Sequence, residues 1–251
     1  MEDNLLFRIV KPDESLSGFV ESFWLLHNAT GKDKEIVVLP DGRVDLILSK
    51  TGTQPFHIML SGLETLPQPV ILEADTLMCA VSFKLPATEL LFPNRISNLL
   101  DYAEYLPDDF WGFDQNDLLD FDNFCQKAAA KITALLPDKT DDRKLRLFQL
   151  IYADKGNLTV RQLSEAVFWN SRQINRYFTS QFGLSLKSYC NILRFRESLG
   201  HLAKGNLFPE LNFADQSHFI KQVRKFSGVI PKELLKNEND RFIQFSTLLP
   251  E

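Results

Sequence analysis

Hydrophobic residues follow two different patterns in the two halves of the chain. Up to about residue 85, short apolar runs alternate with turn residues every 8–12 positions, a spacing that favours strands of a small barrel or sandwich. After that, apolar residues recur every three or four positions, as in amphipathic helices. The expected strands are Ser22–Leu26, Ile36–Leu39, Val44–Leu48, Phe56–Leu60, Val70–Leu72 and Met78–Phe83.

Helices are expected wherever the apolar period is 3–4 residues. A short one starts at Pro86, and 117–136 carries a longer apolar stripe that either pairs with its twin in a dimer or covers the barrel. Residues 138–142 are polar, follow a proline, and form the predicted linker. Further helices are expected over Arg143–Ala153, Thr159–Val167, Ser171–Phe182, Ser185–Ala203, Asp215–Phe226 and Pro231–Lys236.

Charge separates the same two regions. Residues 143–236 contain 16 Lys and Arg against 6 Asp and Glu, an excess of ten positive charges. The remainder contains 12 and 27, an excess of fifteen negative charges, which together give the net charge of −5. An acidic domain joined to a basic one indicates a polyanionic partner for the basic part.

Two helices around residues 159–182 form the clearest functional unit. The first is expected to bury Val160, Leu163 and Val167, and a three-residue turn leads to a second helix that buries Ile174 and Phe178. Asn170 suits the N-cap of the second helix. Because the outer face of that helix is basic and polar, the pair is predicted to be a helix-turn-helix whose second helix enters the major groove of DNA.

The last 110 residues resemble the DNA-binding domain of AraC/XylS-type transcription regulators. The first family motif, A-x-x-V-G-x-S…L-x-R-x-F, is matched over Ser164–Asn170 and Ile174–Phe178, although Phe168 replaces its glycine. The motif that follows is present as Gly183, Ser185, Tyr189 and Arg194. The second signature is present over 212–219 with Gly228 and Pro231.

This resemblance implies two helix-turn-helix units joined by a rigid helix. It places Arg172, Asn175 and Arg176 of the first unit, and Ser217, Ile220 and Lys221 of the second, against base edges. Gln173, Lys187 and Lys225 are expected at backbone phosphates. Only seven residues, 206–212, separate Gly205 from Phe213, so the first helix of the second unit is expected to be shortened to a turn.

Residues 1–137 resemble the cupin-like N-terminal domain of one group of these regulators. Residues 39–48, 81–84 and 110–112 carry that likeness. It implies a domain that binds a small effector or forms a homodimer interface. A candidate effector pocket in the barrel mouth is lined by Trp24, Arg43, Asp45 and Phe83.

The sequence therefore predicts an α+β two-domain protein. A cupin-like barrel with covering helices (1–137) and a linker (138–142) precede an all-α double helix-turn-helix domain (143–251). The predicted function is sequence-specific binding of double-stranded DNA in transcription regulation, by a cytoplasmic homodimer under effector control. The alternatives are a derived sensing or interaction protein with weakened DNA binding, and a cupin-type enzyme.

Chemistry-bearing residues give the enzyme alternative little support. The four histidines (His27, His57, His201 and His218) are scattered, no Cys-x-x-Cys pair occurs, and no nucleophile–base motif is present, so neither a metal, a cofactor nor a catalytic residue is expected. Three separate cysteines are typical of a reducing compartment. Neither a secretory signal nor a membrane-spanning run is expected.

Overall fold

Two compact units make up the chain in the computed structural model, which describes residues 5–207 and 215–246. The first unit contains the chain up to Lys34 together with 43–62 and 71–140. The second contains 35–42, 63–70 and the chain from Asp141 onward. Two segments that precede the predicted linker therefore fold with the C-terminal helices.

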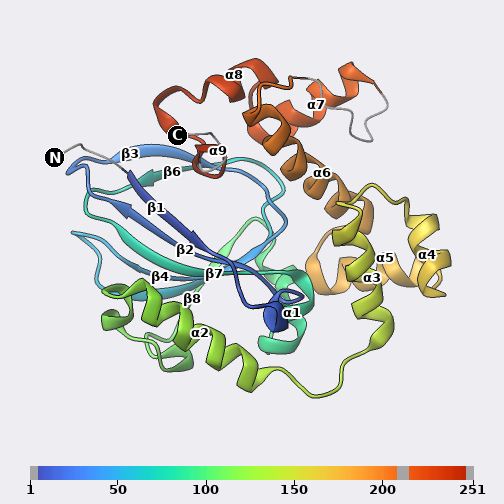
Figure 1. Cartoon of the computed structure of the whole chain (residues 1–251), viewed down its shortest axis with the longest axis horizontal. Coiled ribbons are helices and arrows are strands. Elements are labelled where there is room, and N and C mark those ends of the chain that lie inside the picture. The colour runs from blue at the N-terminus through green and yellow to red at the C-terminus, as the bar shows by residue number, and fades with distance from the viewer. Residues whose placement is uncertain (1–4, 208–214, 247–251) are drawn as a thin grey trace. The chain divides into compact units, whose positions relative to one another are not determined.

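An antiparallel sheet forms the first unit (Figure 1). Its strand order is β1-β2-β7-β4-β5-β8, so β1 and β8 are the two edges and the expected barrel is not closed among the described residues. The sequence pattern missed both edge strands, β1 and β8, in which every residue is half-buried or exposed. The bounds are β1 Leu5–Val10, β2 Val20–Asn28, β4 Val44–Lys50, β5 His57–Ser61, β7 Leu77–Phe83 and β8 Ala103–Leu106.

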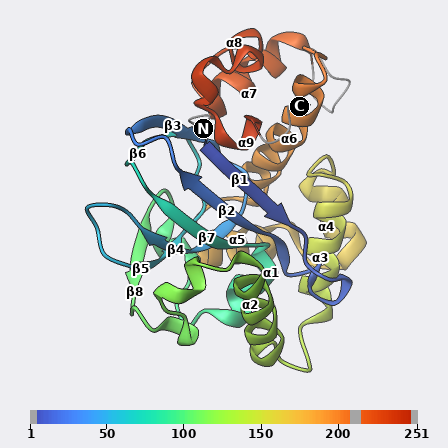
Figure 2. The ribbon, with the colours of Figure 1, turned by 60° about the vertical axis from the view of Figure 1, so that its left-hand side comes forward.

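Helix α2, Phe121–Leu135, lies along one face of this sheet (Figures 1 and 2). Asp120 caps its start by accepting a hydrogen bond from the Asn123 amide. Most of its apolar stripe is buried, with Phe124, Ala128 and Ile132 fully so, and only its last residue, Leu135, is exposed. The structure thus favours the covering role for this stripe over pairing with a second copy. A shorter helix, α1, spans Leu85–Leu91 and has Pro86 in its first turn, as expected.

Helices dominate the second unit. Their bounds are α3 Asp142–Ala153, α4 Val160–Val167, α5 Ser171–Phe182, α6 Leu186–Ala203, α7 Gln216–Ser227, α8 Pro231–Lys236 and α9 Ile243–Ser246. Each predicted helix of this region is present, with ends within one residue of the prediction. Helix α6 is the long connector: α3, α4 and α5 gather at one of its ends, and α7 and α8 at the other (Figure 2).

The two early segments are built into the second unit by backbone hydrogen bonds. They include most of β3 (Lys34–Val38) and of β6 (Gln68–Leu72), which pair as a separate two-stranded sheet. The Val37 amide donates to the Arg241 carbonyl at 2.7 Å. The side chain of Gln244 accepts from the Leu39 amide and donates to the Leu39 carbonyl, both at 3.1 Å. Residues 35–42 therefore complete the packing around α9.

One sequence prediction cannot be compared with the fold. The expected shortening of the second helix-turn-helix concerns 206–212, and of these 208–212, Asn212 included, lie outside the described residues. Within the described residues, none of the helices combines the length and apolar character that spanning a bilayer requires.

Candidate nucleic-acid interface

Helices α4 and α5 are joined by residues 168–170, and each has a side-chain cap at its start. The hydroxyl of Thr159 accepts from the Gln162 amide, and Gln162 reaches back to the Thr159 amide, a capping box. Asn170 accepts from the Arg172 amide at 2.8 Å, as the sequence predicted. These caps fix where both helices begin, and the Asn170 cap therefore sets where the turn between them ends.

The turn residue Phe168 has a left-handed backbone, with φ 52° and ψ 40°. The Trp169 amide donates to the Ser164 carbonyl and the Phe168 amide to the Glu165 carbonyl, the bonding of a Schellman motif, which requires φ > 0 at this residue. The position at which the resembled family has glycine is thus confirmed as one that favours glycine. The Phe168 side chain is 93% exposed.

The outer face of α5 is cationic and polar. Ile174 and Phe178 are fully buried, whereas Arg172, Gln173 and Arg176 are exposed. Asn175 is half-buried at the edge of this face, and its side-chain amide donates to the Ser171 carbonyl at 3.1 Å. Three of the four residues predicted on this helix therefore share the exposed face, and Asn175 borders it.

Two cations from α3 lie over aromatic rings beside α5. The Arg143 guanidinium is 5.8 Å from the Trp169 ring centroid, and the Lys144 ammonium is 4.8 Å from that of Tyr177. The two rings contact each other, with centroids 5.3 Å apart. Sequence reasoning missed both cations because they precede the motif and only the packing of α3 brings them beside it.

Helix α7 has a second basic face. Ser217, Lys221 and Lys225 are exposed, whereas Ile220 is half-buried. Arg224 is also exposed and follows Lys221 by three residues, so it lies on the same face. The prediction missed it, although this spacing was available as a signal. The remaining predicted phosphate contact, Lys187, is exposed in the first turn of α6.

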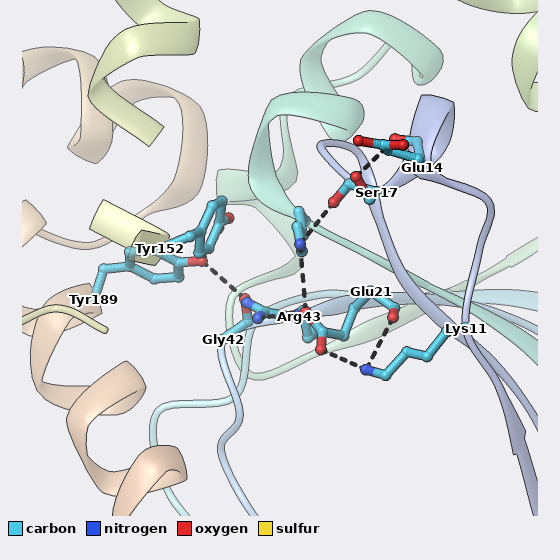
Figure 3. Close-up of polar contacts among 9 residues, drawn as sticks. Lys11, Glu14, Ser17, Glu21, Gly42, Arg43, Tyr152 and Tyr189 are labelled. Atoms are coloured by element: carbon cyan, nitrogen blue, oxygen red, sulfur yellow. Dashed lines mark hydrogen bonds and ion pairs between the residues drawn. The ribbon is translucent and has the colours of Figure 1, made fainter. Parts of the chain in front are cut away.

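In the first unit, the Glu21 carboxylate gathers three cations (Figure 3). Lys11 and Arg43 each approach it to 2.9 Å and Lys84 to 3.8 Å. The Arg43 side chain is only 3% exposed. This predicted effector residue is thus engaged in a buried ion pair, where its first role is to balance a carboxylate.

The other three candidate effector residues do not share one surface. On β7, Ala80 pairs with Trp24 and Ser82 pairs with Asp45. Because side chains alternate along a strand, Trp24 and Asp45 lie on one face of the sheet, and Phe83 points to the other. Phe83 is fully buried and contacts the rings of Phe92 and Trp111. Of these three residues, Trp24 and Asp45 share a face and Phe83 does not.

In the second unit, the Tyr189 hydroxyl is hydrogen-bonded on two sides (Figure 3). It donates to the Gly42 carbonyl at 3.1 Å and contacts the Tyr152 hydroxyl at 2.9 Å. Gly42 has φ +75°, and a Cβ there would lie 3.1 Å from both Leu193 and Tyr189 side-chain atoms. The turn at 40–42 therefore fits closely against α6.

Groups that bind metals or act as nucleophiles are sparse. Within the described residues, no three His, Cys, Asp or Glu side chains are grouped so as to hold a metal ion. All three cysteines are buried and free. Burial raises the pKa of Cys79 and of Cys190 to about 12, and that of Cys125 to about 11, so these thiols stay protonated at neutral pH.

A family model described as a domain of unknown function (DUF6597) matches residues 8–104. No curated protein matches the sequence. Among solved structures, ToxT from Vibrio cholerae O395 is 11% identical, with 82% of this chain and 94% of that chain covered at a TM-score of 0.44. Wild-type ToxT from strain SCE256 with a bound unsaturated fatty acid is 15% identical, with both chains fully covered at a TM-score of 0.42. This likeness is loose, and it identifies neither a ligand nor a partner for this chain.

Proposed function

We propose that this protein is a sequence-specific DNA-binding transcription regulator that acts in the cytoplasm, with α5 in the major groove. The observation that carries the proposal is the exposed face of α5. Arg172, Gln173 and Arg176 project from a helix whose other face is anchored by Ile174 and Phe178. The resemblance of this region to AraC/XylS-type regulators supports the same reading.

The chemistry of this face suits base recognition. Arg172 and Arg176 can each donate two hydrogen bonds to O6 and N7 of guanine, and Asn175 at the edge of the face can make the corresponding pair with adenine, while Gln173 is placed to contact a phosphate. The excess of ten positive charges over 143–236 adds attraction to phosphates, which supplies affinity without sequence preference. Specific DNA binding needs side chains that contact bases and cations that contact phosphates. The capped helix α5 and the positive charge around it offer both.

Selection of binding sites from random duplexes tests the proposal directly. We expect a defined site, and we expect Arg176→Ala to weaken binding to it by about 1–3 kcal/mol while relaxing the preference at one base pair. A matched control is Arg161→Ala on α4, because Arg161 is already paired with Glu165 at 2.9 Å and lies outside the reading face. The Arg161→Ala variant should select the same DNA sequence as the wild type.

Two outcomes would contradict the proposal. If Arg176→Ala weakened all duplexes equally, α5 would not be reading bases. If the wild-type protein selected no sequence and bound no duplex in dilute buffer, the chain would be a sensing or interaction protein derived from a regulator.

The sheet face that carries Trp24 and Asp45 is our proposed effector surface. Trp24 is half-buried and stacks on Phe7, with ring centroids 6.2 Å apart, while Asp45 lies across from Ser61 and Ser82. An indole beside a carboxylate and hydroxyls offers both apolar and polar contacts to a small molecule. A compound that raises the Tm of the wild type but not of Trp24→Ala would support this assignment. Equal shifts in both would contradict it.

We further propose that the working form is a homodimer, because two copies allow recognition of two half-sites on successive turns of DNA. Sedimentation of the protein with and without a selected duplex tests this. A single copy on every duplex at micromolar concentration would contradict it.

A further inference from the structure

Arg143 and Lys144 lie in the first turn of α3, over one continuous aromatic surface. Trp169 comes from the turn before α5 and Tyr177 from α5 itself, and their ring centroids are 5.3 Å apart. Arg143 covers the first ring at 5.8 Å and Lys144 the second at 4.8 Å. We name these four residues the aromatic–cation cluster.

Helical geometry places this cluster along one side of the reading face. Successive residues of a helix are 100° apart, so Tyr177 neighbours Gln173 at the preceding turn, while Asn175 borders the opposite side. Trp169 directly precedes the cap residue Asn170 and so extends the same border to the start of the helix. A helix in the major groove has a phosphate backbone along each side, and the cluster occupies one of these sides.

The rings hold the two cations beside the exposed face of α5. A cation is attracted electrostatically to an aromatic face, so the rings restrict the rotamers of the Arg143 and Lys144 side chains. Side chains that are already restricted lose less rotamer freedom when they bind a ligand. The Arg143 side chain is still 62% exposed, so it remains accessible to a ligand. The Asp141 carboxylate lies 3.8 Å from Nε of Arg143. The same carboxylate caps α3, because it accepts hydrogen bonds from the Arg143 and Lys144 amides.

We propose that Arg143 and Lys144, positioned by Trp169 and Tyr177, bind the phosphates of the DNA strand that runs along this side of α5. This inference rests on the proposed function, and it adds α3 to the DNA-binding surface. It also assigns the rings a positioning role, which Tyr177 would have in addition to packing against Phe148 and Phe182.

The salt dependence of affinity measures these contacts. We expect the double variant R143Q/K144Q to lower the slope of log affinity against log salt by about 1.8, because each phosphate contact contributes about 0.9. Its loss of affinity between 50 and 200 mM salt should then be about 12-fold smaller than that of the wild type. The preferred sequence should not change. Lys50→Gln, an exposed lysine of the first unit, is the control and should leave the slope unchanged.

A second variant changes the charge in the opposite direction and spares the fold. Asp141→Asn keeps an N-cap side chain but removes the anion beside Arg143, so it should bind duplexes more tightly than the wild type. Unchanged or weaker binding by Asp141→Asn would count against the cluster.

The role of the rings is tested through Tyr177. Tyr177→Phe keeps the aromatic face and should bind as the wild type does, whereas Tyr177→Leu should bind several-fold more weakly with its preferred sequence unchanged. Urea titration identifies any loss of folding, and equal binding by the Leu and Phe variants would overturn the positioning role.

The outcomes separate this inference from the proposed function. If the wild type selects a DNA site but R143Q/K144Q retains its full salt slope, the cluster is not a phosphate site and the regulator assignment stands. If the wild type binds no duplex, both are overturned.

Discussion

Replacing Phe168 with glycine is expected to stabilise the protein while leaving DNA binding unchanged. The Schellman bonds at the end of α4 hold this residue at φ 52°, a conformation that costs a non-glycine residue about 1–2 kcal/mol. Glycine removes this strain but makes the unfolded chain more flexible, which costs about 0.4–1 kcal/mol. Since the side chain is 93% exposed, little apolar burial is lost. The net gain should be up to about 1.5 kcal/mol.

Urea unfolding of a short series at this position measures the effect. Phe168→Gly should raise the denaturation midpoint without changing the m-value. Phe168→Asn should raise it less, because asparagine tolerates the left-handed region better than most residues. Phe168→Ala is the control, since it removes the ring but keeps the strain, and its stability should stay close to that of the wild type.

Two results would refute the reasoning. If Phe168→Ala stabilised as much as Phe168→Gly, the exposed ring and not the backbone would be the source of instability. If Phe168→Gly lowered the midpoint, the ring would be making contacts that its exposure does not reveal.

Four further tests follow from the packing. Lys187→Gln should weaken all duplexes alike and lower the salt slope by about 0.9, so an unchanged slope excludes a phosphate contact. Gly156→Ala should lower the free energy of unfolding more than Gly205→Ala does. Both glycines have φ near +80°, but a Cβ at Gly156 would lie 2.6 Å from the backbone oxygen of Cys190, whereas one at Gly205 would meet nothing within 4 Å. Equal urea midpoints for the two variants would contradict this packing. Tyr189→Phe should cost about 1–3 kcal/mol in urea unfolding, because the Gly42 carbonyl loses its buried donor. Burial raises the pKa of Cys190 from 9.0 to about 12, so stability should fall as pH rises from about 9 towards 12, and a flat profile contradicts the burial.

Local patterns predicted the helices of the second unit well. Caps such as Asn170, a glycine at a helix end such as Gly183, and a proline at a helix start such as Pro231 act on adjacent residues, so they are visible in the sequence. The same holds for Phe168, whose left-handed conformation is determined by the helix end it terminates. Six strands were likewise predicted, namely the inner strands β2, β4, β5 and β7 of the main sheet and the pair β3 and β6. The alternation along β4 and β5 reflects a sheet with one covered face.

Features that depend on long-range packing were not predictable. The edge strands β1 and β8 carry exposed apolar residues such as Leu6 and Tyr105, which obscure the alternation. Phe83 was placed in a pocket with Trp24 and Asp45, but strand register decides which face a side chain occupies, and it places Phe83 on the opposite one. The cations of α3 became part of the candidate interface only through the packing of α3 beside α5.

The chain passes between its two units at Lys34–Glu35, Gly42–Arg43, Gly62–Leu63, Val70–Ile71 and Thr140–Asp141. A protease that cleaved only around residue 140 would therefore not release an intact helical half, since Leu39 and its neighbours would stay on the other fragment. A gene fragment that began at residue 143 would lack the backbone partners of Arg241 and Gln244 and would leave the region around Phe242 and Phe245 uncovered. During synthesis, Gln244 of α9 emerges near the end of the chain and forms its hydrogen bonds with Leu39, which is made 205 residues earlier.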